Sequence, residues 1–200
     1  MNSDIKKRIE KVNRVSQWAM HLGSEVEYIA TSPMHAKYKI MLLMVYVDIF
    51  SQVWDTSLGQ PHKTQKDRFT TWLDKFVFNG ANATYRDNQD ELDPLDSVSV
   101  YKIRNSLLHF GGLPRLNLPV FIADYNKSTF REKHKSEIAA RDVLVLCPGV
   151  LFPAIAYAVA ATFTKFADQQ ATNPTGYEDL MIQLYDKLQD NCALPIQSAN

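Results

Sequence analysis

Few cysteines, no excess of either charge and no apolar leader limit what this chain of 200 residues can be. Cys147 and Cys192 are too few for a disulfide scaffold or a cysteine-based zinc site, so we expect two free thiols. The 22 Lys and Arg residues are balanced by 22 Asp and Glu residues, which excludes the broad basic surface that holds duplex nucleic acid. Any contact with RNA must therefore come from a local cluster of positive groups.

The sequence also lacks a clear membrane segment. Its start, MNSDIKKRIEKVNR, has no apolar core of the secretory type, which favours a cytoplasmic protein. The longest uncharged run, Val143–Thr164, has the 22 residues that a span requires, but Pro148-Gly149 and Pro153 interrupt it. We expect a short strand, VLVLC, and then a buried helix from Pro153 to Ala167 that is too short to cross a bilayer.

Apolar residues make up 46% of the chain, enough for one domain with a real core. The spacing of apolar residues predicts a mostly α fold: an up-and-down bundle of five to six helices, with a small β-hairpin after the fourth predicted helix. The predicted parts are an N-terminal helix and linker (1–30), core helices (33–112), the β excursion (118–147) and C-terminal helices (150–190).

Local signals predict where these helices begin and end. Ser32-Pro33 opens the apolar run MHAKYKIMLLMVYVDIFSQVW, which we interpret as the central helix. Asp93-Pro94 opens a helix that ends at Gly111, and Asp96 adds a favourable charge in its first turn. A capping box at Thr175–Glu178 opens the last helix. A third helix, RFTTWLDKFVF, places four side chains on one face: Phe69, Trp72, Leu73 and Phe76. The three tryptophans of the chain are expected in the core: Trp18, Trp54 and Trp72.

The stretch RNSLLH lies in the last two turns of the predicted helix from Pro94 to Phe110. On a helical wheel, one face of this helix is apolar and belongs to the core: Val100, Ile103, Leu107 and Phe110. A second arc mixes polar and apolar side chains, as in a cleft or a subunit contact rather than open solvent: Tyr101, Arg104, Asn105, Leu108 and His109.

Arg104, Asn105 and His109 are suited to cleavage of RNA without a metal or other cofactor. An imidazole can accept the proton of a ribose 2′-hydroxyl or protonate the leaving oxygen. A guanidinium can hold the phosphate and stabilise the charge of the transition state, and an amide can orient either group. The spacing alone leaves a structural alternative open, in which His109 stabilises the helix C-terminus and Arg104 pairs with a carboxylate.

The segment Arg104-Asn105-x-x-x-His109 resembles the Arg-x4–6-His motif of HEPN-superfamily ribonucleases, in which a polar residue often follows the arginine. Its place late in a helical bundle, after RFTTWLDKFV and a long apolar helix, is similar to single-domain members of bacterial defence and toxin systems. The resemblance covers Met34 to Pro114. It implies a homodimer whose motif helices face each other, RNA products with 2′,3′-cyclic phosphate and 5′-hydroxyl ends, and a separately encoded antitoxin as a possible partner. It implies that Arg104 binds the phosphate, His109 is the acid or base, and Asn105 orients them.

Two further residues are candidates for the same site. Asp48 lies in the apolar helix and therefore requires a partner if it is buried. It fixes Arg104, forms a plain structural salt bridge, or lies at a partly exposed position. Tyr101 lines the cleft, stacks on a base, or packs in the dimer contact. The positive groups of Lys127–Arg141 either follow an RNA backbone or belong to a solvated loop. The other histidines lack metal-ligand spacing, so we expect surface or helix-end positions: His21, His35, His62 and His134.

Three functions remain open on these patterns. The first is an endoribonuclease of HEPN type. The second is a HEPN-like module that binds RNA or a protein without cutting. The third is a helical protein of unrelated function, one version of which associates with a membrane through Val143–Thr164.

Overall fold

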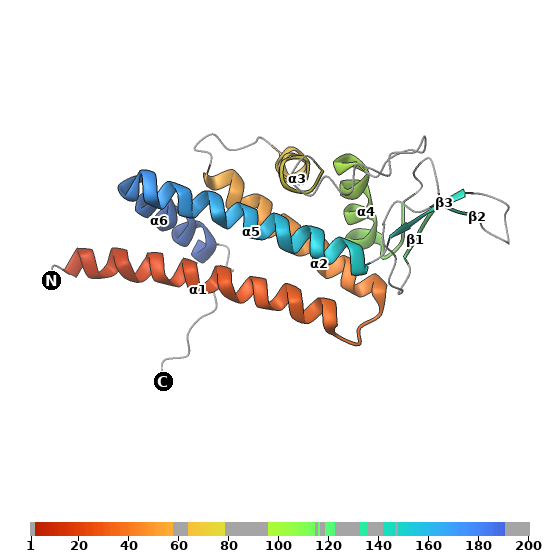
Figure 1. Ribbon diagram of the computed structural model, residues 1–200, viewed down its shortest axis with the longest axis horizontal. Helices are drawn as coiled ribbons and strands as arrows, with labels where there is room; N and C mark the ends of the chain where they lie inside the picture. Colours follow the sequence, from red (N-terminus) through yellow and green to blue (C-terminus); the bar gives the residue numbers. More distant parts are fainter. Residues whose placement is uncertain are drawn as a thin grey trace.

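A computed structural model of the chain describes residues 3–57, 64–78, 96–114, 116, 119–122, 133–135, 142–146 and 148–190. These residues form six α-helices, one π-helical turn and three short strands, so the predicted helical bundle is confirmed (Figure 1). The elements, in chain order, are α1 (Ser3–Thr31), α2 (Ala36–Ser57), α3 (Gln65–Leu73), the π-helical turn η1 (Asp74–Phe78), α4 (Ser97–Phe110), β1 (Val120–Ile122), β2 (Lys133–Lys135), β3 (Asp142–Leu146), α5 (Pro148–Thr172) and α6 (Pro174–Asp190).

Helix α2 lies at the centre of the bundle, as its sequence predicted. It contacts each of the other five helices. Its apolar side chains Ile40, Leu43, Val47 and Phe50 are fully buried, because a helix that is apolar on most sides needs cover on most sides. The long helices α1, α2 and α5 lie along the long axis of the molecule, whereas α3 is seen end-on and therefore crosses them (Figure 1).

Aromatic rings from several helices meet within a core that is otherwise mainly aliphatic. Trp72 of α3 stacks on Phe50 of α2 at 6.5 Å between ring centroids, and Trp54 meets Phe76 edge-on at 4.9 Å. The predicted buried face of the third helix is confirmed, since its four side chains and all three tryptophans are at most 8% exposed. The one polar atom of Trp72 is satisfied: its indole Nε1 donates to Thr162 Oγ1 of α5 at 3.1 Å.

Several predicted helix ends are wrong. The first helix continues to Thr31 without a linker, and Ser32 does not cap α2; its hydroxyl instead donates to the Ile29 carbonyl at the end of α1. Asn173, not Thr175, caps α6 by accepting from the Gly176 amide at 3.1 Å. Helix α5 begins at Pro148 and extends to Thr172, so Pro153 lies inside it. Proline is tolerated there because it removes only one hydrogen bond, close to the helix start.

The β excursion lies where it was expected, at one end of the bundle, but its pairing differs from the prediction. The predicted strand VLVLC forms β3, which pairs in parallel with β1, Val120 opposite Leu144, so these two strands do not form the predicted hairpin. Strand β2 provides the antiparallel partner on the other side of β3, giving the order β1-β3-β2. Residues 123–141 supply the dozen or more residues that a parallel connection needs.

Among the described helices, none combines the length and the apolar character needed to cross a bilayer. The expected reason is wrong, however, because α5 has 25 residues and continues through Pro153. Residues 143–146 of the uncharged run lie in strand β3 and residues 148–164 lie in α5, which packs on α1, α2 and α6.

We predict that Thr162→Val destabilises the fold by about 1–3 kcal/mol, because it leaves the buried Trp72 N–H without an acceptor. The measurement is the free energy of unfolding in urea. Thr164→Val is the matched control, since Thr164 makes the same kind of bond to a carbonyl one turn earlier but is exposed; it should change stability by less than about 0.5 kcal/mol. Equal effects of the two substitutions would contradict the role of the Trp72 bond.

Candidate functional site

Helix α4, which carries the motif, is closed at both ends by its own residues. At the start, the Asp96 side chain accepts from the Ser99 amide at 2.6 Å, so Asp96 is the N-cap rather than a residue of the first turn. The predicted cap, Asp93-Pro94, lies outside the described residues. At the end, Gly111 adopts a left-handed conformation with φ of 63°, and its amide donates to the Leu107 carbonyl, as predicted for a terminating glycine.

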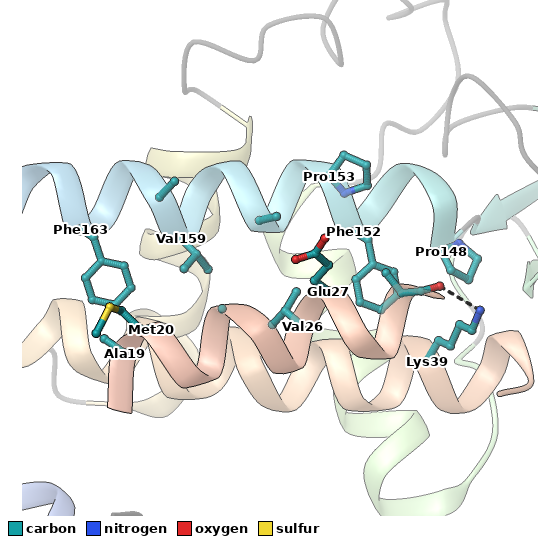
Figure 2. A pocket seen from close by; sticks show the side chains of 14 residues that line it. Ala19, Met20, Val26, Glu27, Lys39, Pro148, Phe152, Pro153, Val159 and Phe163 are labelled. Carbon is teal, nitrogen blue, oxygen red and sulfur yellow. Dashed lines mark hydrogen bonds between the residues drawn. The ribbon is translucent and has the colours of Figure 1, made fainter. Parts of the chain in front are cut away.

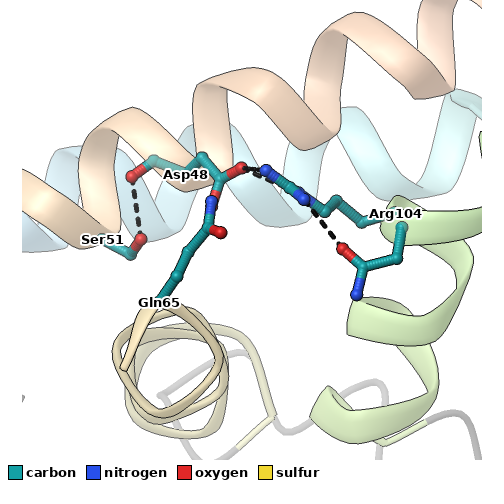
Figure 3. A network of polar contacts seen from close by, with 5 residues as sticks. Asp48, Ser51, Gln65 and Arg104 are labelled. Atoms are coloured by element: carbon teal, nitrogen blue, oxygen red, sulfur yellow. Dashed lines mark hydrogen bonds and ion pairs between the residues drawn. The ribbon is translucent and has the colours of Figure 1, made fainter. Parts of the chain in front are cut away.

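The guanidinium of Arg104 is held by the carboxylate of Asp48. Nε of Arg104 donates to Asp48 Oδ2 at 2.8 Å, and one terminal nitrogen forms an ion pair with the same oxygen. The other carboxylate oxygen, Oδ1, accepts from the Gln65 side chain at 3.1 Å. Figure 3 shows how this network joins three helices: Asp48 from α2, Gln65 from α3 and Arg104 from α4.

This ion pair is largely withdrawn from solvent, with side-chain exposures of 11% for Arg104 and 15% for Asp48. Burial explains why the pair forms, since a carboxylate within the apolar helix α2 would be costly to bury without a cationic partner. Of the alternatives left open for Asp48, contact with Arg104 is therefore what the structure shows. The same contact is the carboxylate pairing of Arg104 that the structural interpretation of the motif anticipated.

Asn105 lies beside the same guanidinium. Its side-chain oxygen accepts from Arg104 Nη1 at 2.8 Å, so the polar residue after the arginine does help to orient it. A guanidinium has five N–H donors, and Asp48 and Asn105 account for three of them here. Within the described part of the chain, the other two donors have no hydrogen-bond partner, and they could bind a ligand such as a phosphate.

Tyr101 is half-buried and packs within the subunit. Its ring meets Phe69 of α3 edge-on at 5.4 Å, and the Arg104 guanidinium carbon lies 6.0 Å from the ring centroid. Cation–π attraction at this distance adds a third support for the arginine. The tyrosine therefore helps to place Arg104 and fastens α4 to α3.

His109 and Phe110 stand exposed at the C-terminal end of α4. Phe110 is 85% exposed, which contradicts its predicted place on the core face. Val100, Ile103 and Leu107 do lie in the core, but the core ends one turn before Phe110. Among the described side chains, none hydrogen-bonds to the His109 imidazole, whose ring contacts that of Phe110 with centroids 6.4 Å apart.

The structure brings together only part of the predicted site. Arg104, Asn105, Asp48 and Tyr101 are in contact. His109 takes no part in this set of contacts, and its ring contacts Phe110 instead. Gln65 is a member of the network that sequence reasoning missed. Its signal was weak, because only the crossing of α3 over α2 places the first residue of α3 beside Asp48.

The other candidates add no second polar centre to the described part of the chain. His21 pairs with Glu25 one turn away on α1, and His35 is exposed. Among the residues whose placement is described, no three His, Cys, Asp or Glu side chains gather as a metal ion would need. His62 and most of the Lys127–Arg141 run lie outside the described residues, and the His134 side chain is likewise not described.

We predict strong energetic coupling between Asp48 and Arg104. Either Asp48→Ala or Arg104→Ala should cost about 3 kcal/mol, because each leaves a mostly buried charge unpaired. The double variant should lose less than the sum of the two single losses, by at least about 1.5 kcal/mol. Urea unfolding of all four proteins gives this coupling energy. The exposed pair Lys165–Asp168 is the control cycle, with a coupling below about 0.5 kcal/mol; additive losses for Asp48 and Arg104 would contradict the prediction.

The chain shows no match to a protein-family model, to a curated protein or to a solved structure. A function must therefore be argued from the motif on α4, from its surroundings and from the resemblance of its sequence to the HEPN pattern.

Proposed function

We propose that this chain is a metal-independent endoribonuclease of HEPN type that acts as a homodimer. The observation that carries the proposal is the exposed His109 at the end of the same helix whose Arg104 is fixed by Asp48 and Asn105. An exposed imidazole is open to a substrate, and an arginine held in one orientation needs no ordering when a phosphate arrives.

The proposed reaction is transfer within the RNA backbone. One imidazole removes the proton of a ribose 2′-hydroxyl, and the resulting oxygen forms a bond to phosphorus while the bond to the 5′-oxygen breaks. A second imidazole, in protonated form, gives its proton to that 5′-oxygen. The products are a 2′,3′-cyclic phosphate and a 5′-hydroxyl, and neither water nor an oxidant is consumed.

A dimer is part of the proposal because one subunit supplies too few catalytic histidines and too little positive charge. A single chain has one motif histidine, and the charge of its Arg104 is offset by Asp48. Two motif helices that face each other would place two histidines and two arginines at one cleft. The exposure of Phe110 beside His109 supports this, since a subunit contact would bury a large apolar side chain. A bacterial toxin or defence role, with a separately encoded antitoxin, belongs to the same proposal.

A specific observation favours a second function, a module that binds RNA or a protein without cutting. The Arg104 guanidinium is paired with Asp48 of α2 and mostly buried. If this ion pair persists in the dimer, Arg104 stabilises the bundle and has few N–H groups left for a phosphate. RNA would then be held at the α4 surface and remain intact.

We predict that the wild-type protein cleaves total bacterial RNA in EDTA and that His109→Ala lowers the cleavage rate at least about 100-fold, the usual scale of general acid–base catalysis. His21→Ala is the matched control, an exposed histidine on α1 whose loss should leave the rate unchanged. Product ends mapped by phosphatase and kinase treatment should carry cyclic phosphates. Cleavage that survives in His109→Ala sinks the proposed role of this residue, and binding of RNA without cleavage by the wild type favours the second function.

We further predict that Phe110→Ala weakens the dimer at least about tenfold, because it removes a large apolar side chain from the contact. Sedimentation equilibrium measures the dissociation constant. Tyr28→Ala, at an exposed position of α1 far from the motif in sequence, is the control and should leave it unchanged. An unchanged dissociation constant in Phe110→Ala would show that the dimer contact does not include Phe110.

A further inference from the structure

A groove of about 760 Å³ runs between α1 and α5, apart from the motif helix. Its walls are mainly apolar, and Figure 2 shows Phe163 and Met20 at one end and Lys39 and Pro148 at the other. The volume lies within the range of small-molecule pockets, which are typically apolar with a few polar groups in fixed places.

The groove exists because small residues stand where two helices face each other. Gly23 on α1 and Ala156 and Ala160 on α5 line it. A Cβ atom added at Gly23 would meet nothing within 4 Å, so the space beside this residue is open. The floor is deep: Val26, Phe152 and Val159 line the groove and are only 3–6% exposed.

Lys39 places a positive charge at the end of this apolar space. The residue is 9% exposed, and its ammonium donates to the Ala30 carbonyl at 3.1 Å (Figure 2). Among the described residues, no carboxylate lies within ion-pair distance of it. Glu27 also lines the groove, but it is exposed to water and forms no ion pair with Lys39. A buried ammonium has three donors and favours an anionic partner. Only one of the three has a hydrogen-bond partner among the described residues.

We propose that the groove binds a single-chain amphiphile with a carboxylate head, such as a fatty acid, with its acyl chain along the groove and its head at Lys39. The lining residues Ala19 and Ala30 of α1 are eleven positions apart, about 16 Å along the helix. With C–C bonds of about 1.5 Å, that length accommodates a zig-zag chain of roughly a dozen carbons. This inference does not depend on the proposed ribonuclease activity.

The test is isothermal titration calorimetry of the full chain with laurate below its micelle concentration, with dodecanol as the uncharged probe of equal length. We expect one laurate per chain, bound at least tenfold more tightly than dodecanol. Lys39→Met, which retains an apolar side chain of similar length, should weaken laurate binding at least tenfold. Lys165→Met, an exposed lysine on α5, is its control and should have no effect.

Gly23→Leu provides an independent variant that should fold well, because leucine has a better helix propensity than glycine. Its side chain should fill the groove and abolish laurate binding, whereas Gly23→Ala, with the same backbone benefit and little added volume, should retain binding. Absence of saturable binding to the wild type, or binding that Gly23→Leu leaves intact, would overturn the proposal. Equal affinity for laurate and dodecanol would overturn the role of Lys39. A dimer that Gly23→Leu dissociates, without laurate binding, would show that a second copy of the chain occupies the groove.

Discussion

The bundle depends on the burial of α2, a helix that is apolar on most of its surface and is contacted by all five other helices. Covering such a helix is the main source of stability here, since each fully buried Leu, Ile, Val or Phe contributes about 1.5–3 kcal/mol. The same burial creates a difficulty at Asp48, the carboxylate that α2 presents between α3 and α4. Its charge is accommodated because two helices bring donors to it, Gln65 to one oxygen and Arg104 to the other. The packing of α2 and the position of Arg104 are thus parts of one arrangement.

This arrangement has opposite consequences for catalysis by Arg104. Asp48, Asn105 and Tyr101 hold the guanidinium in one place, so it loses little conformational freedom when a phosphate binds. The carboxylate that holds it also cancels much of its charge, and charge is what a phosphate transition state requires. A ribonuclease with this site must gain its positive potential from a second subunit or from residues beyond the described ones. A binding module has no such requirement, which is why the ion pair itself favours the second function.

The sequence predicted the helices better than their ends or their contacts. The central place of α2 and the buried face of α3 followed from apolar periodicity, which reflects the burial of whole faces. The N-cap residues were harder to predict. Asp96 and Asn173 cap α4 and α6, where the sequence suggested Asp93 and Thr175, because neighbouring Asp, Asn and Thr side chains compete for the same amide groups. Phe110 was wrongly placed in the core because a helical wheel shows the face of a helix but not the position along its axis. On α4 the buried residues end at Leu107, one turn before Phe110. The parallel pairing of β1 with β3 and the contact of Gln65 with Asp48 depend on how distant segments cross, and no local pattern records that.

Arg104 and Lys39 are buried cations of this bundle, and their surroundings differ in a way that bears on function. Arg104 has a carboxylate, an amide oxygen and an aromatic ring around it, so the fold satisfies most of its needs. Lys39 has one backbone carbonyl among the described residues and borders an apolar groove. Arginine is suited to the first setting because its planar fork can bind several acceptors at once, whereas an ammonium group concentrates its charge at one point. A cation already satisfied by the fold contributes to stability, and a cation left with free donors beside open space can still gain from a ligand. On that physical ground, the groove between α1 and α5 is a second place to look for a function, separate from the motif on α4.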